Sequence, residues 1–82
     1  MRYETTTRAI PPTVLALARE FFGQRYGLRE VSATPRSVSF EGGGGGVAVS
    51  ARGTREGTAV EVVAREWDYQ AQEFLRLLRQ AR

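Results

Sequence analysis

The fold of this 82-residue chain is decided by residues 28–65, LREVSATPRSVSFEGGGGGVAVSARGTREGTAVEVVAR. Apolar residues occupy alternate positions in four short runs of this stretch: Val31 and Ala33; Val38 and Phe40; Val47, Val49 and Ala51; Val60, Val62 and Ala64. A period of two is typical of β-strands, and the polar residues in between indicate a sheet with one wet face. We therefore predict four antiparallel strands joined by three turns.

The first of these turns sets the expected register. Pro35 stands at the second position of a four-residue turn, where its fixed φ is favoured. Pairing Ala33 with Val38 across this turn also pairs Val31 with Phe40. All four apolar side chains then lie on one face, whereas a shift by one residue would turn half of them outward.

The five consecutive glycines, Gly42–Gly46, suggest two interpretations. A glycine-rich loop can hold phosphate with its backbone N–H groups, but such loops usually lead into a helix, often with a lysine nearby. Here a strand follows, and the chain has no lysine. We therefore predict a flexible hairpin loop at Gly42–Gly46 and a third reversal at Arg52–Gly57.

The segments on either side complete the pattern. Residues 2–9 alternate, with Tyr3, Thr5 and Thr7 on one side, which predicts a fifth strand near a sheet edge. A helix is expected to begin around Pro12 and end at Gly27. Its apolar stripe consists of Val14, Leu15, Leu17, Ala18, Phe21 and Phe22.

A second helix is expected to follow Trp67, with Asp68 as its N-cap. Apolar residues recur there with helical spacing, at Trp67, Ala71, Phe74, Leu75 and Leu78. We expect Glu73 to pair with Arg76, three residues further along the same helix. The sequence thus predicts one α+β domain over residues 1–82, in which β-α-β-β-β-β-α elements form a two-layer structure with both helices on one face of a five-stranded antiparallel sheet.

Two known folds share this element order. It resembles one repeat of the TATA-binding-protein-like fold. The segments Ala9-Ile10-Pro11-Pro12-Thr13-Val14 and Glu66-Trp67-Asp68 are similar to parts of the START/polyketide-cyclase superfamily, which has the helix-grip fold. The second resemblance implies a carrier of a small apolar ligand. The chain lacks the extra strands and helix that open the helix-grip cavity, so we expect aromatic side chains to fill that space.

Composition excludes several chemistries. There is no Cys, His or Lys, all twelve basic residues are Arg, and the net charge is +3. Disulfides, thiolate metal sites and imidazole bases are therefore not available. We predict no cofactor, no metal site and no membrane association, and we expect a cytoplasmic protein of bacterial type.

We predict no catalytic residues either. Glu41 and Glu61 should lie on the wet face of the sheet near Arg52 and Arg65. An acid–base pair needs one carboxyl with a raised pKa, and that requires burial. We therefore expect a protein that is not an enzyme.

The wet face carries small or apolar residues where a monomer would usually carry long charged ones. The leading interpretation is a protein-interaction module that forms a homodimer through this face, with an edge strand around Val31 as the competing contact. The expected dimer face consists of Ser39, Ala48, Ser50, Ala59, Glu61, Val63 and Arg65, flanked by Ser32.

Two alternatives remain open. A nucleic-acid-binding module would use an arginine-rich surface of Arg8, Arg52, Arg65, Arg76 and Arg79, with Arg82 beyond them. A carrier of a small apolar ligand would need a void between helices and sheet. The mild net charge and the short chain favour neither nucleic acid nor a small molecule as the partner.

Overall fold

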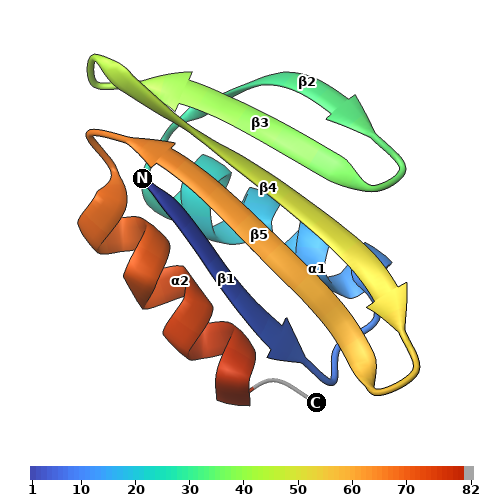
Figure 1. Ribbon diagram of the computed structural model, residues 1–82. Coiled ribbons are helices and arrows are strands. Elements are labelled where there is room, and N and C mark those ends of the chain that lie inside the picture. The colour runs from blue at the N-terminus through green and yellow to red at the C-terminus, as the bar shows by residue number, and fades with distance from the viewer. Residues whose placement is uncertain (81–82) are drawn as a thin grey trace.

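The structure, a computed structural model, describes residues 1–80 of the chain (Figure 1). Its elements are β1 (Arg2–Thr7), α1 (Pro11–Ala18), the π-helical segment η1 (Arg19–Arg25), β2 (Arg29–Thr34), β3 (Ser37–Gly42), β4 (Gly45–Thr54), β5 (Gly57–Arg65) and α2 (Asp68–Gln80). The five strands form one antiparallel sheet in the order β1-β5-β4-β3-β2. The predicted α+β class and element order are confirmed, and β1 lies at an edge as expected.

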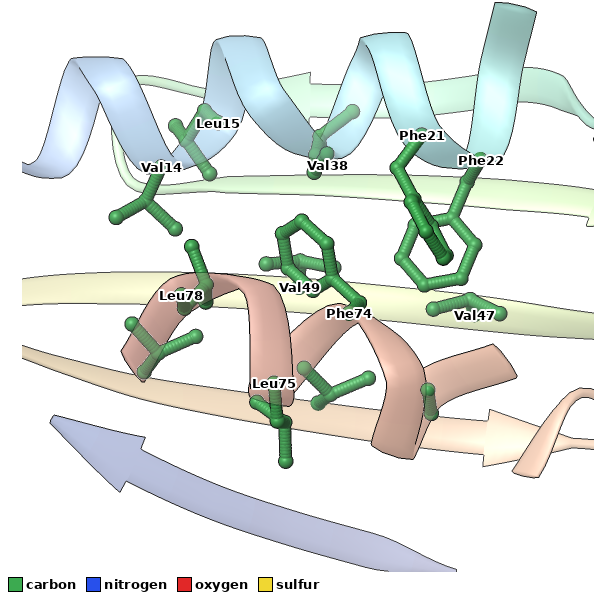
Figure 2. Close-up of a cluster of buried hydrophobic side chains, with 14 of the residues drawn as sticks. Val14, Leu15, Phe21, Phe22, Val38, Val47, Val49, Phe74, Leu75 and Leu78 are labelled. Atoms are coloured by element: carbon green, nitrogen blue, oxygen red, sulfur yellow. The ribbon is translucent and has the colours of Figure 1, made fainter. Parts of the chain in front are cut away.

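Both helices pack on the same face of the sheet, because that face carries the large apolar side chains. In β4 and β5, Val47, Val49, Val60 and Val62 are buried, while the residues between them are less so. Phe22 links the layers: its ring centroid lies 5.8 Å from that of Phe40 in β3 and 5.2 Å from that of Phe74 in α2. Figure 2 shows Phe22 and Phe74, together with Val47 and Val49, in the space between the helices and the strands.

The first helix begins one residue earlier than expected and changes its form halfway. Pro11 and Pro12 occupy its first turn, and the N–H of Val14 donates to the carbonyl of Ile10 at 3.1 Å. After Ala18 the chain continues as a π-helix, whose wider turn lets the adjacent Phe21 and Phe22 both face the core. The sequence pattern gave no sign of this change.

Only half of the register predicted for the first hairpin is confirmed. Ala33 pairs with Val38, which is confirmed, but Phe40 pairs with Glu30 and not with Val31, because the register shifts between Glu30 and Ser32. The prediction that Val31 and Ala33 lie in the core is wrong, because every residue of β2 is exposed. The helices lie mainly over the other four strands, and only η1 approaches β2, where Arg19 pairs with Glu30 at 2.9 Å.

The glycine run makes a tighter reversal than the predicted flexible loop. The turn itself is Gly43-Gly44, with φ of 58° and 79°, and this left-handed backbone suits a two-residue hairpin turn. Gly45 and Gly46 belong to β4 and are buried. A Cβ at Gly45 would lie 2.0 Å from the carbonyl oxygen of Arg65, so the close approach of the two strands requires glycine there.

Trp67 is only half-buried, so its predicted place in the core needs correction. Its indole lies over the glycine turn, and Nε1 donates to the carbonyl of Gly42 at 2.9 Å. The carbonyl of Trp67 accepts the N–H of Ala71 at 2.9 Å, the first hydrogen bond of α2. Asp68 is therefore the first helical residue and not the predicted N-cap.

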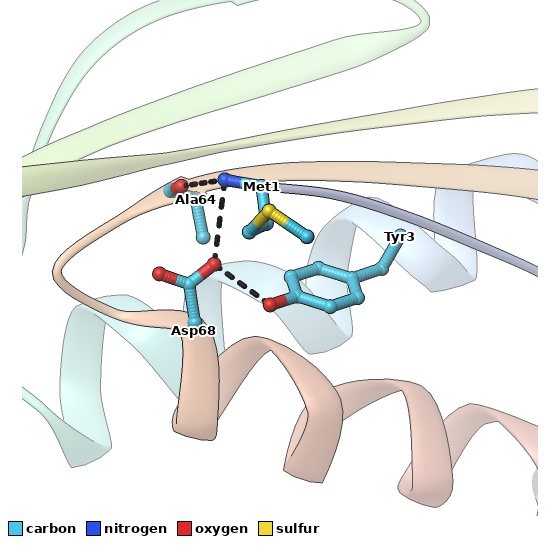
Figure 3. Close-up of polar contacts among 4 residues, drawn as sticks. All are labelled: Met1, Tyr3, Ala64 and Asp68. Atoms are coloured by element: carbon cyan, nitrogen blue, oxygen red, sulfur yellow. Dashed lines mark hydrogen bonds and ion pairs between the residues drawn. The ribbon is translucent and has the colours of Figure 1, made fainter.

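The carboxylate of Asp68 instead ties α2 to β1 (Figure 3). Its Oδ1 accepts a hydrogen bond from the Tyr3 hydroxyl at 2.8 Å and lies 3.4 Å from the amino group of Met1. The bond from Tyr3 lowers the pKa of Asp68, partial burial acts in the opposite direction, and the Met1 ammonium lowers this pKa further. Asp68 therefore binds its proton less tightly in the folded protein than in the unfolded chain.

We expect Phe74→Ala to lower the free energy of unfolding by about 3–5 kcal/mol, as for other fully buried aromatic residues. Phe74 is almost fully buried and touches the rings of Phe21 and Phe22, so its removal leaves a cavity. Leu77 in the same helix is 47% exposed, and Leu77→Ala should cost less than about 1 kcal/mol. Urea unfolding followed by circular dichroism measures both, and equal losses would contradict the assignment of the core face.

The contact of Asp68 predicts a specific sensitivity to acid. Because its pKa is lowered from the ordinary value of about 3.9, its contribution to stability is present above that pH and is lost as pH falls through the folded-state pKa. Tyr3→Phe should reduce the drop in melting temperature between pH 7 and pH 3. Tyr69→Phe, at an exposed tyrosine of the same helix, should leave that drop unchanged; a reduced drop in both variants would contradict the assignment.

Candidate interaction surface

The face of the sheet opposite the helices is uncovered and is turned toward the viewer in Figure 1. The strand pairing arranges its side chains in rows across the sheet. One row runs from Val63 through Ala48 to Ser39, and the next runs from Glu61 to Ser50. Ala59 and Arg65 lie on either side of these rows along β5. The structure thus brings together all of the residues expected at a dimer face: Ser39, Ala48, Ser50, Ala59, Glu61, Val63 and Arg65. We call them the outer-face set.

The side chains in the middle of the outer-face set are small. Ala48, Ser50 and Ala59 are half-buried, although no helix covers them. Val63, in the same row as Ala48, is 41% exposed, which is comparable to the exposure of Val31 and Leu77 elsewhere on the surface. A wet sheet face of a monomer usually alternates long polar side chains there, so the small residues leave room for a second layer.

A hollow of about 650 Å³ opens on the same face, over β1, β4 and β5. Ser50 and Ala59 line it, and the longer side chains of Glu4, Arg36 and Arg52 stand around it. Val63 lies one row away from this hollow along β5. The face therefore presents an exposed apolar side chain beside a depression.

Some of the charged side chains of this face form ion pairs within the monomer. Glu61 forms an ion pair with Arg2 at 3.3 Å, and Glu41 forms one with Arg29 at 3.9 Å. Glu4 lies directly opposite Glu61 in the β1–β5 pair, and like charges in this position destabilise a sheet. Within residues 1–80, Glu4 has no ion pair, so a positive charge from a partner would stabilise this corner.

Glu41 and Glu61 do not come together as a catalytic pair. Arg65 lies four positions after Glu61 in β5, and its row leads through Gly46 to Glu41 in β3. The two carboxylates are thus roughly 13 Å apart along the strands and roughly 10 Å apart across them. Among the described residues no group of His, Cys, Asp and Glu side chains is arranged to hold a metal ion.

The five arginines of the nucleic-acid alternative do not form one patch. Arg52 and Arg65 lie toward opposite ends of the outer face, Arg8 follows β1, and Arg76 and Arg79 belong to α2 in the other layer. The sixth, Arg82, lies outside the described residues. Arginine spacing along the sequence could not reveal this separation, because it depends on the strand order.

The predicted pair of Glu73 with Arg76 is wrong. Glu73 instead accepts a hydrogen bond from the Tyr26 hydroxyl at 2.8 Å and lies 3.7 Å from Arg25. The bond to Glu73 raises the pKa of Tyr26. Arg25 also lies over the ring of Phe21, 5.3 Å from its centroid. Glu73 therefore contacts Arg25 and Tyr26, at the end of η1, and not Arg76 of its own helix.

The sequence analysis did not identify three residues of the outer face: Glu4 and Arg36, which line the hollow, and Arg2, which pairs with Glu61. The alternation of β1 places Arg2 and Glu4 on its polar side, but only the pairing of β1 with β5 brings them beside Glu61. No local signal predicts that two strands more than fifty residues apart will pair.

The space expected for a small apolar ligand is occupied by side chains. Phe22, Phe40 and Phe74 are almost fully buried between the helices and the sheet. An apolar surface groove of about 280 Å³ remains between α1 and α2, beside Leu17 and Leu77. Neither helix of residues 1–80 has the length and hydrophobicity needed to cross a lipid bilayer.

Searches against protein-family models, curated proteins and solved structures found no match to this chain.

Proposed function

We propose that this protein is a non-enzymatic interaction module that forms a homodimer through the outer-face set. The observation that carries the proposal is an uncovered sheet face with small side chains in its middle and an exposed valine beside a hollow. Small side chains allow two sheets to approach to the roughly 10 Å of face-to-face packing.

The area of the face is sufficient for such a contact. Five strands spaced by about 4.8 Å give a width of about 24 Å, and a strand of about eight residues is about 26 Å long. Two copies would therefore bury about 1,200 Å² in total, which is at the lower end of specific interfaces. This size fits a dimer of moderate affinity.

The shape of the face fits a copy of itself. In a two-fold contact each contact occurs twice, so an exposed side chain of each copy can meet the hollow of the other. Val63 of each copy would enter the partner's hollow beside Ser50 and Ala59. Arg52 of one copy would lie near Glu4 of the other and offset the repulsion between Glu4 and Glu61.

The competing contact through the edge at β2 is less well supported. The register shift next to Val31 disrupts the ladder there, and such bulges are a common means of preventing edge pairing. Arg29 and Glu30 add charge to the same edge.

We predict that Val63→Arg converts the dimer to a monomer without unfolding the protein, because a long charged side chain would keep the two sheets apart. Val31→Arg is the matched control, since Val31 is 43% exposed against 41% for Val63. It should leave the dimer intact. Light scattering behind a sizing column, across micromolar concentrations, gives the mass of each variant.

The control also separates the two contacts. A dimer that survives Val63→Arg and is lost in Val31→Arg would replace the face contact with an edge contact. A wild-type mass of one chain at every concentration would contradict self-association altogether.

A further inference from the structure

A second surface lies at the opposite edge of the sheet from β2. Strand β1 pairs only with β5, so its other side is open. The amino group of Met1 donates to the carbonyl of Ala64 at 2.7 Å, and the N–H of Ala64 donates to Met1 at 2.8 Å. Met1 and Ala64 are therefore a hydrogen-bonded pair. Along an antiparallel ladder, hydrogen-bonded pairs alternate with non-hydrogen-bonded pairs. Arg2, Glu4 and Thr6 therefore direct their backbone N–H and C=O groups away from β5.

A polar hollow of about 510 Å³ lies beside this open edge, between β1 and α2. Three arginines line it: Arg2 from the strand, and Arg76 and Arg79 from successive turns of the helix. Figure 1 shows α2 running beside β1 along the length of the strand. Glu4 is the one acidic residue in the lining, so the hollow is positively charged overall.

The two helical arginines are available to a partner. Within residues 1–80, Arg76 forms no ion pair, and Arg79 donates only a 3.3 Å hydrogen bond to the Thr5 hydroxyl. Arg2 pairs with Glu61, but its side chain is still largely exposed. Arginine guanidinium groups bind carboxylates with two parallel hydrogen bonds, so this site can hold carboxylates.

We propose that β1 and α2 together bind an extended acidic peptide segment of another protein, which adds to the sheet as a sixth strand. Its backbone pairs with Arg2, Glu4 and Thr6, the mode of recognition by strand addition. Because side chains of a strand alternate between its two faces, acidic residues at every second position would all point toward Arg76 and Arg79.

A second copy of this chain does not fit the edge as well as an acidic segment does. Pairing β1 with its own copy would bring the positive hollows of the two molecules toward each other. The proposed dimer face lies on the flat of the sheet, so it leaves this edge open. The peptide pairs with the backbone of β1, whereas the dimer uses side chains of the outer face, and Arg2 and Glu4 border both sites.

Proline at position 4 gives a sharp test. The N–H of Glu4 points to the open edge, so Glu4→Pro removes an edge donor without breaking the β1–β5 ladder, which is where proline is tolerated in sheets. Glu4→Ala is the matched control because it also loses the carboxylate but keeps the N–H. Any effect of Glu4 on the outer face therefore appears in both variants.

The probe is an acetylated octapeptide of alternating Glu and Thr, titrated into the ¹⁵N-labelled full chain at 25 mM salt and followed by NMR. We expect saturable shifts at the amides of Arg2, Glu4 and Thr6. Glu4→Pro and the double variant Arg76→Ala/Arg79→Ala should each weaken binding at least about tenfold, while Glu4→Ala binds as well as the wild type or better. A peptide of alternating Lys and Thr should not bind.

Three outcomes would overturn the proposal. The first is no saturable binding of the acidic peptide. The second is equal binding by Glu4→Pro and Glu4→Ala, which would mean that the arginines attract anions without strand addition. The third is tighter binding of an eight-nucleotide oligothymidylate that ignores Glu4→Pro, which would assign the arginines to nucleic acid.

Discussion

The alternation of side chains along β4 and β5 is the constraint on which the rest of the structure depends. From Val47 to Ala51 in β4 and from Val60 to Ala64 in β5, every second residue is a buried valine or alanine, and those side chains point to one face. The helices must cover that face, because apolar surface left in water would cost about 25 cal/mol for each Å². The same alternation leaves Ala48, Ser50, Ala59 and Val63 on the other face, which no element of residues 1–80 covers.

The two helices are held to the sheet by different means. The first helix is anchored by aromatic packing, since Phe21 and Phe22 contact each other and Phe74. The second is also fixed at both ends by polar contacts: Tyr3 reaches Asp68 at its start, and the Thr7 hydroxyl donates to the carbonyl of Leu78 near its end, at 2.7 Å. These contacts hold α2 beside β1, and this placement creates the hollow lined by Arg76 and Arg79.

Much of the fold could be predicted because it follows local periodicity. The period-two runs located four strands, and helical spacing identified Phe22, Phe74 and Leu78 as core residues. The errors arose where the outcome depends on distant parts of the chain. Val31 fits the strand pattern, but β2 extends beyond the helices and bulges there. Glu73 has a suitable neighbour in its own helix, yet Arg25 and Tyr26 reach it from η1. The outer-face set was predictable from alternation alone, whereas only the pairing of β1 with β5 brings Arg2 and Glu4 beside it.

When helices cover just one side of a sheet, the other side must be stable either in water or against a partner. Small side chains suit a water-exposed sheet face poorly, but they allow a second sheet to pack closely. This contrast is the basis of the proposed dimer. Isotope-filtered NMR on a mixture of ¹³C-labelled and unlabelled chains tests the contact most directly. We predict intermolecular NOEs from the methyl groups of Ala48, Ala59 and Val63. Intermolecular NOEs confined to Val31, or none at millimolar concentration, would contradict the account.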